Sequence, residues 1–151
     1  MKKTYYQVLN KMSEIALSGV SECFIGDIWE VEAVARKYPL LVIDPHLKNH
    51  TYQNGLFKLK LDLYMVDLVL DDESNELEVL SDMTGYMIQY LNYLRDHLET
   101  YGFYWRKDLN TSINLQTFTE KWDDSVSGVK AEIEIMVPDD GNLCKNIWTN
   151  A

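Results

Sequence analysis

Residues 56–70 read LFKLKLDLYMVDLVL and alternate between apolar and polar side chains along most of their length. Side chains in a β-strand point alternately to the two faces of a sheet, so this alternation predicts a strand with one apolar face. The apolar face comprises Phe57, Leu59, Leu61, Leu63 and Met65. The opposite face comprises Lys58, Lys60, Asp62 and Tyr64. We expect the first face to belong to the core and the second to meet either solvent or a partner.

A long helix is predicted to follow this strand after the acidic turn at residues 71–73 and to end near Gly102. Asn75 and Glu78 stand in the relation of a capping box at its start. Apolar residues then recur at intervals of three and four, as on a buried helix face. This stripe comprises Leu77, Leu80, Met83, Met87, Leu91, Leu94, Leu98 and Tyr101. Gly85 is unfavourable inside a helix, and it therefore predicts a close approach of the helix backbone to the sheet.

Shorter segments complete the prediction of an α+β fold. Thr4 opens a Thr-x-x-Gln box, which predicts a first helix that continues to Gly19. Further strands are predicted at residues 23–25, 40–43, 103–105, 112–118 and 129–137, and residues 29–37 fit either a helical turn or a strand. We therefore expect a mixed or antiparallel sheet with a long hairpin, one long helix packed across it and an N-terminal helix.

The composition predicts one globular domain, because the chain has 151 residues, of which 46% are hydrophobic and 25% are charged. We assign residues 1–138 to this domain and residues 139–151 to a C-terminal tail. The tail is polar apart from Leu143, Ile147 and Trp148. Trp148 has no apolar neighbourhood of its own to pack on, so we expect the tail to dock on a neighbouring subunit.

The net charge and the two cysteines argue against a nucleic-acid-binding protein and against a fold held by disulfides or zinc. The formal net charge is -10, which argues against binding along a nucleic acid backbone, where affinity comes from Lys and Arg. Cys23 and Cys144 are far apart and show no CxxC spacing, so we expect free thiols in a reducing compartment. Lys2 and Lys3 are followed by polar residues rather than by the apolar region of a signal peptide, and no run of about 18 apolar residues predicts a membrane span.

Histidines offer few candidates for chemistry. His46 and His50 have the spacing of two ligands on one helix face, but they follow Pro45 in a predicted loop and lack the Glu of a HExxH site. His97 lies beside acidic residues on the long helix and is interpreted as a solvated surface histidine. No GxSxG elbow, phosphate-binding loop or dinucleotide fingerprint is present in the sequence.

Acidic residues are interpreted in the same way. Asp71, Glu73 and Asn75 match the first positions of a calcium loop, but Glu76 stands where the loop needs Gly. Asp67 interrupts an apolar segment, which fits either a buried functional carboxylate or, as we favour, an edge position. We accordingly predict no catalytic residue, no cofactor and no metal, and the chain is not expected to be an enzyme.

Aromatic residues outside the helix stripes are the remaining unusual feature, since aromatic side chains anchor interfaces as well as cores. They are Trp29, Tyr104, Trp105, Phe118, Trp122 and Trp148. For each of these except Trp148, a place in the core is at least as well supported as a place in an interface. The residues that we assign to an interface are Phe118, Trp122, Trp148, Ile147 and Tyr64.

Residues 118–128, FTEKWDDSVSG, followed by the alternating strand up to Pro138, resemble the C-terminal signature of the tail terminator and tail-completion proteins of tailed bacteriophages. Other features agree in order along the chain. They are a first helix, the Gly26-Asp27 pair, the Tyr38-Pro39-Leu40 start of a strand, a long strand pair and one helix across the sheet.

This resemblance implies a structural virion protein of the phage neck or tail, made in the host cytoplasm. Such a protein forms a ring of six or twelve copies, contacts connector or portal-associated proteins and tail proteins, and lets DNA pass through its lumen without specific binding. The strand from Leu56 and residues 118–128 would then form the subunit contacts. A different class remains open, namely a monomeric acidic module of the immunity or DNA-mimic inhibitor type, which the net charge of -10 also favours.

Overall fold

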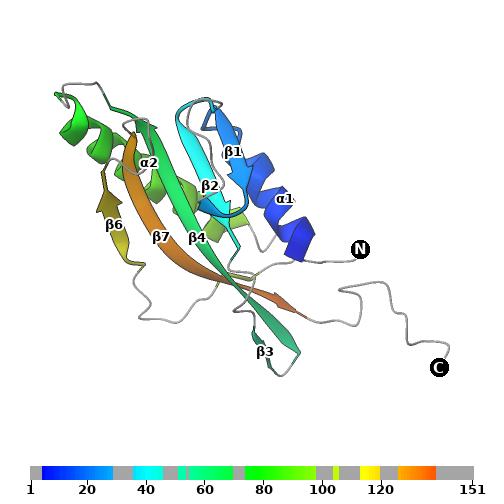
Figure 1. Ribbon diagram of the computed structural model, residues 1–151. Helices are drawn as coiled ribbons and strands as arrows, with labels where there is room; N and C mark the ends of the chain where they lie inside the picture. Colours follow the sequence, from blue (N-terminus) through cyan, green and yellow to red (C-terminus); the bar gives the residue numbers. More distant parts are fainter. Residues whose placement is uncertain are drawn as a thin grey trace.

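The computed structural model describes residues 5–28, 36–45, 51–53, 55–69, 74–97, 104–105, 113–119 and 126–138 (Figure 1). Two helices, α1 (Tyr5–Ala16) and α2 (Glu76–His97), lie on the same face of one sheet. The sheet is built from β1 (Glu22–Ile25), β2 (Leu40–Asp44), β3 (Thr51–Gln53), β4 (Leu56–Leu68), β5 (Tyr104–Trp105), β6 (Leu115–Phe118) and β7 (Val126–Pro138). This arrangement confirms the predicted α+β fold.

The strand order is β1-β2-β4-β7-β5, while β3 pairs with β4 and β6 pairs with β7. β1 and β2 are parallel, and every other pair is antiparallel, so the sheet is mixed. The long strand forms a short hairpin with β3, a strand that is not among those predicted from the sequence. Gly55 lies in this turn at a φ of 77°, a conformation that favours glycine.

β4 and β7 form the axis of the sheet. They pair along 13 residues each, from Leu56 opposite Pro138 to Leu68 opposite Val126, although α2, β5 and β6 separate them in the chain. The two backbones come very close at Gly128. A Cβ added there would lie 2.0 Å from the backbone oxygen of Met65, so no larger residue fits without a shift of one strand.

The main core lies between the helices and the sheet. It receives the predicted apolar face of β4, the inner faces of both helices, and Val129, Ala131, Ile133 and Ile135 of β7. Its largest fully buried side chains include Met12, Leu59, Leu61, Leu63, Met65, Met83, Met87 and Leu94. At roughly 1.5–3 kcal/mol for each large apolar side chain, this burial is the main stabilising contribution in the fold.

The stripe predicted for α2 is correct from Met83 to Leu94 but wrong at its start. Leu77 is 82% exposed, whereas Val79 is buried. A helix turns about 100° per residue, so these two side chains point to nearly opposite sides. Tyr90, which the prediction omitted, lies seven residues after Met83 and therefore on the same side, where it is buried.

Gly85 does not mark a close approach of α2 to the sheet. A Cβ added at this position would meet no atom within 4 Å. The prediction for this glycine is therefore wrong, and the close approach occurs at Gly128 on β7 instead. α2 begins at Glu76 directly after Asn75, as the capping pattern predicted.

The other face of the sheet carries a second, smaller core, which was not predicted from the sequence. Its buried members are Ile28, Leu40, Val42, Tyr64 and Val66, with Phe24, Tyr38 and Phe118 packed against them. The expectation that this face of β4 meets solvent or a partner therefore holds only near its start, where Lys60 is exposed. The strand predicted at residues 40–43 is confirmed as β2, and these four residues are inaccessible to solvent on both faces of the sheet.

Candidate functional site

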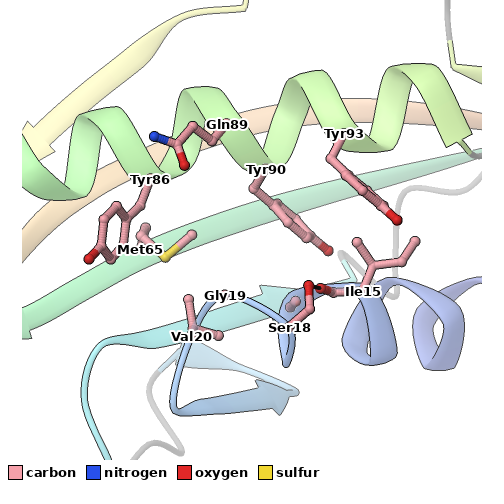
Figure 2. Close-up of a pocket in the computed structure, with 10 residues that line it drawn as sticks. Ile15, Ser18, Gly19, Val20, Met65, Tyr86, Gln89, Tyr90 and Tyr93 are labelled. Atoms are coloured by element: carbon pink, nitrogen blue, oxygen red, sulfur yellow. Dashed lines mark hydrogen bonds between the residues drawn. The ribbon is translucent and has the colours of Figure 1, made fainter.

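A half-open groove of about 340 Å³ lies between the end of α1 and the middle of α2. Met65 of β4 forms its floor, and the turn after α1 forms one wall. Figure 2 shows the Tyr86, Tyr90 and Tyr93 side chains projecting from α2 toward that turn. The other lining residues are Ile15, Ala16, Ser18, Gly19, Val20 and Gln89. We call this hollow the tyrosine groove.

The wall after α1 is held by hydrogen bonds that use the last carbonyl groups of the helix. The amides of Gly19 and Val20 both donate to the carbonyl oxygen of Ala16, at 2.9 and 3.0 Å. The Ser18 hydroxyl donates to the carbonyl oxygen of Ile15 at 2.7 Å. These bonds satisfy helix-terminal acceptors that would otherwise face the groove. The turn therefore presents a largely satisfied backbone and the apolar side chain of Val20.

The opposite wall combines one fixed and two accessible tyrosines. The Tyr90 hydroxyl donates to the backbone oxygen of Met12 at 2.8 Å, and burial raises the pKa of this phenol well above its usual value. Tyr86 and Tyr93 are 41% and 46% exposed, so their rings remain available to a partner. Tyr93 is also stacked on His97, with ring centroids 3.8 Å apart and an angle of 8° between the planes.

The chemistry of the tyrosine groove favours binding over catalysis. None of its described lining residues is charged, and none is His or Cys. Accessible tyrosine rings over an apolar floor are typical of surfaces that receive apolar or aromatic side chains. This site was not predicted from the sequence, although the seven-residue spacing of Tyr86 and Tyr93 places both rings on one side of the helix, beside the buried stripe.

Exposed apolar side chains are not confined to the groove. Large hydrophobic residues with at least two fifths of their surface exposed are Tyr6, Leu17, Tyr52, Leu68, Leu77, Tyr86, Ile88 and Tyr93. All of these except Tyr52 lie on or directly after the two helices, or at the end of β4. Single exposed apolar side chains are common on protein surfaces, so only Tyr86 and Tyr93, which share the tyrosine groove, indicate a binding surface here.

Two of the predicted interface residues meet in the second core. Tyr64 is only 4% exposed, and its ring contacts Phe118 edge-to-face, with centroids 6.0 Å apart. Phe118 is half-buried at the end of β6, opposite Gly128. Tyr64 thus packs within its own chain, and Phe118 is the member of this pair that has surface left for a partner. Trp122, Ile147 and Trp148 lie outside the described residues.

Next to this aromatic pair, three carboxylates lie in one row across β2, β4 and β7. The register places Asp44 opposite Asp62 and Asp62 opposite Glu132. Lys130 Nζ lies 3.5 Å from an oxygen of Asp62 and 3.5 Å from one of Glu132. Desolvation lowers the pKa of Lys130. The nearby Asp62, Tyr64 and Glu132 together raise the pKa by a larger amount, so it lies above its usual value. The ammonium group therefore neutralises part of the row.

The edge strand β1 is joined to the segment that precedes β2. Glu22 accepts hydrogen bonds from the Arg36 guanidinium at 3.0 Å and from the Lys37 amide at 2.8 Å. The bond from the Lys37 amide is the largest cause of the lowered pKa of Glu22. Arg36 also lies over the ring of Phe24, 4.5 Å from its centroid. These contacts hold β1 in place at the edge of the sheet.

The other candidates for chemistry are not brought together. His46 and His50 lie outside the described residues. The His97 Nδ1 donates to the backbone oxygen of Tyr93 at 2.9 Å, as expected for a histidine on the helix surface. Asp67 is half-buried, its pKa is raised by desolvation, and it accepts a hydrogen bond from the Leu68 amide. It lies one residue beyond the last pair between β4 and β2, so one side of the strand is unpaired there, although β4 is not an edge strand.

No group of three or more His, Cys, Asp or Glu side chains among the described residues is arranged to hold a metal ion. In the same residues, neither helix is long and apolar enough to cross a membrane. No protein-family model, curated protein or solved structure matches the chain.

Proposed function

We propose that the chain is a structural subunit of a tailed-bacteriophage particle, made in the host cytoplasm and built into the neck or the tail end. Copies of the chain assemble into a ring of six or twelve, which contacts connector or portal-associated proteins on one side and tail proteins on the other. The ring works without catalytic turnover. DNA passes through its lumen, and no membrane is involved.

The observation that carries this proposal is the difference between the two ends of the sheet. Among the described strands, β1 pairs only with β2 at one end, and β5 and β6 pair only with β7 at the other. Pairing of β1 in one copy with the opposite edge of the next would extend the sheet from subunit to subunit. Such a contact joins unlike surfaces, so it repeats head to tail and closes into a ring when the rotation allows.

The surface and the charge of the chain support the same proposal. Exposed apolar residues on both helices provide surface that a neighbouring subunit can cover. A net charge of -10 suits a channel through which DNA slides, since an acidic wall repels the phosphate backbone. The resemblance of residues 118–128 to phage tail-completion proteins agrees with both.

Negative-stain electron microscopy of the purified chain tests this proposal, with and without a tail-tube or connector preparation from the same phage. We expect closed rings with a central opening. Separate particles of single-chain size under both conditions would contradict the proposal. If those particles bound a basic enzyme tightly, the acidic inhibitor class, which the charge of -10 also favours, would replace it.

A further inference from the structure

We propose that the tyrosine groove is the docking site for the C-terminal tail of a second copy of the chain, with Ile147 and Trp148 as the inserted side chains. This inference rests on the proposed function, because it names the surface through which neighbouring subunits hold one another. The occupant is a segment of this chain, residues 139–151, whose sequence is DDGNLCKNIWTNA.

The groove and the tail are complementary in polarity. Tyr86 and Tyr93 offer half-exposed rings above an apolar floor at Met65. In the tail, Ile147 and Trp148 are adjacent and are surrounded by polar residues. Covering both surfaces together removes apolar area from water on each side, at roughly 25 cal/mol for each Å². Aromatic pairs add a directional preference to this gain.

Charge also favours the tail as the occupant. The whole tail, residues 139–151, carries Asp139, Asp140 and Lys145, a net side-chain charge of -1 against -9 on the rest of the chain. Both acidic residues lie at its start, so residues 141–151 hold no acidic side chain. Two acidic chains repel each other through most of their surfaces. The end of the tail is exempt from this repulsion, and the groove that would receive it has no charged residue among its described lining.

The direction of β7 favours a groove in a second copy as the binding site of the tail. β7 runs antiparallel to β4, so the chain leaves it at Pro138 opposite Leu56 and heads away from Met65 in the floor of the groove. Nine residues of β4 separate Leu56 from Met65, which corresponds to about 30 Å.

The ten residues from Pro138 to Trp148 span at most about 33–36 Å when fully extended. This reach exceeds the distance of about 30 Å to Met65 by only a few Å, so a tail that first reverses its direction and then rises from the sheet to the helices has little length to spare for its own groove. The tail therefore serves a neighbour, and repetition of this contact links each copy to the next.

A disulfide between two chains tests the inference, because the tail contains Cys144 and the groove wall contains the exposed Ser18. The double variant Ser18→Cys, Cys144→Ser is mixed with the unaltered chain under mild oxidation. A link between the thiol introduced at position 18 of one chain and Cys144 of the other can then form only between copies. Asn92→Cys in the same Cys144→Ser background is the matched control, because Asn92 is exposed on α2 and does not line the groove.

We expect linked dimers at least tenfold more abundant with the Ser18→Cys variant than with the Asn92→Cys control, and peptide mass spectrometry should identify the bond between positions 18 and 144. Trp148→Ala in the chain that carries Cys144 should abolish that excess while leaving the melting temperature unchanged. Equal yields for the two positions would overturn the inference, whether or not rings form. In the single variant Ser18→Cys, which retains Cys144, a bond within one chain would also overturn it. Rings without the bond would leave the proposed function standing.

Discussion

The hydroxyl of Tyr90 in α2 donates a hydrogen bond of 2.8 Å to the backbone oxygen of Met12 in α1, and it joins two helices whose contacting residues lie 78 positions apart in the chain. Both residues belong to the main core. This bond fixes the width of the tyrosine groove, because Tyr90 lies in one wall and α1 leads directly into the other.

Removal of this hydroxyl should destabilise the fold. We expect Tyr90→Phe to lower the free energy of unfolding by about 0.5–1.5 kcal/mol, the net value of a buried hydrogen bond, as measured by urea denaturation. Tyr93→Phe is the matched control, because Tyr93 is half-exposed, and it should change stability by less than about 0.5 kcal/mol. Equal effects of the two variants would contradict the structural role of the bond.

Replacement by alanine should change the stability of the chain in opposite directions at Gly85 and at Gly128. Gly85→Ala should stabilise the chain by about 0.5–1 kcal/mol, because the added methyl group meets open space and alanine favours a helix. Gly128→Ala should destabilise it by about 1–3 kcal/mol or more, because the Cβ collides with the backbone of Met65. Thermal unfolding of both variants measures the difference, and a stabilised Gly128→Ala variant would show that β4 and β7 are farther apart.

Leu77 and Leu94 test the position of the buried stripe on α2. Leu94→Ala should cost about 2–5 kcal/mol, because this side chain is inaccessible to solvent. Leu77→Ala should change stability by less than about 0.5 kcal/mol, since Leu77 is 82% exposed. Chemical denaturation distinguishes them, and a large loss for Leu77→Ala in a monomeric sample would contradict the helix orientation.

The buried thiol of Cys23 should make the folded chain less stable at alkaline pH. Burial raises the pKa of its thiol from 9.0 to about 11. The unfolded chain therefore loses this proton first, the folded chain holds more protons between pH 9 and 11, and stability falls as the pH rises through that range. The stability lost across this range is about 3 kcal/mol.

The rate at which Cys23 reacts with a thiol-selective alkylating reagent, measured against pH in a Cys144→Ser variant, follows this titration directly, because only the thiolate reacts. We expect the midpoint of the Cys23 titration to lie near pH 11. Tyrosines also titrate in this range, so the stability of a Cys23→Ala variant is measured against pH as well, and the difference between the two stability profiles gives the contribution of Cys23. A midpoint near 9 would show that the thiol is in contact with water.

The regular periodicities explain why much of this fold could be predicted from the sequence. A strict two-residue alternation placed β4 and β7, and a stripe at three- and four-residue intervals placed α2, because each pattern reflects a face buried by local geometry. The start of the predicted stripe was wrong. Leu77, Leu80 and Met83 follow one another at intervals of three residues, and two such intervals rotate a side chain by 120° around the helix axis. The predicted stripe therefore placed Leu77 on the buried face, where the structure has Val79.

The second core and the tyrosine groove depend on contacts between distant parts of the chain, which no local pattern contains. Ile28 packs with residues of β2 and β4, and it turns a face predicted to be open into a buried one. The groove exists because the turn at Gly19 and Val20 lies beside Tyr86 and Tyr93, more than 60 residues later. The same limit applies to the two glycines, since only the assembled sheet shows that Gly128, not Gly85, meets another backbone.

The central claim is that this chain functions as an assembled ring of its own copies. Multi-angle light scattering of the full chain, over a wide range of concentrations and at low and physiological salt, tests it most directly. We predict a discrete species at six or twelve times the 17.6 kDa of one chain. A mass of 17.6 kDa at every concentration and salt, both for the chain alone and after addition of the tail-tube or connector preparation, would contradict the claim.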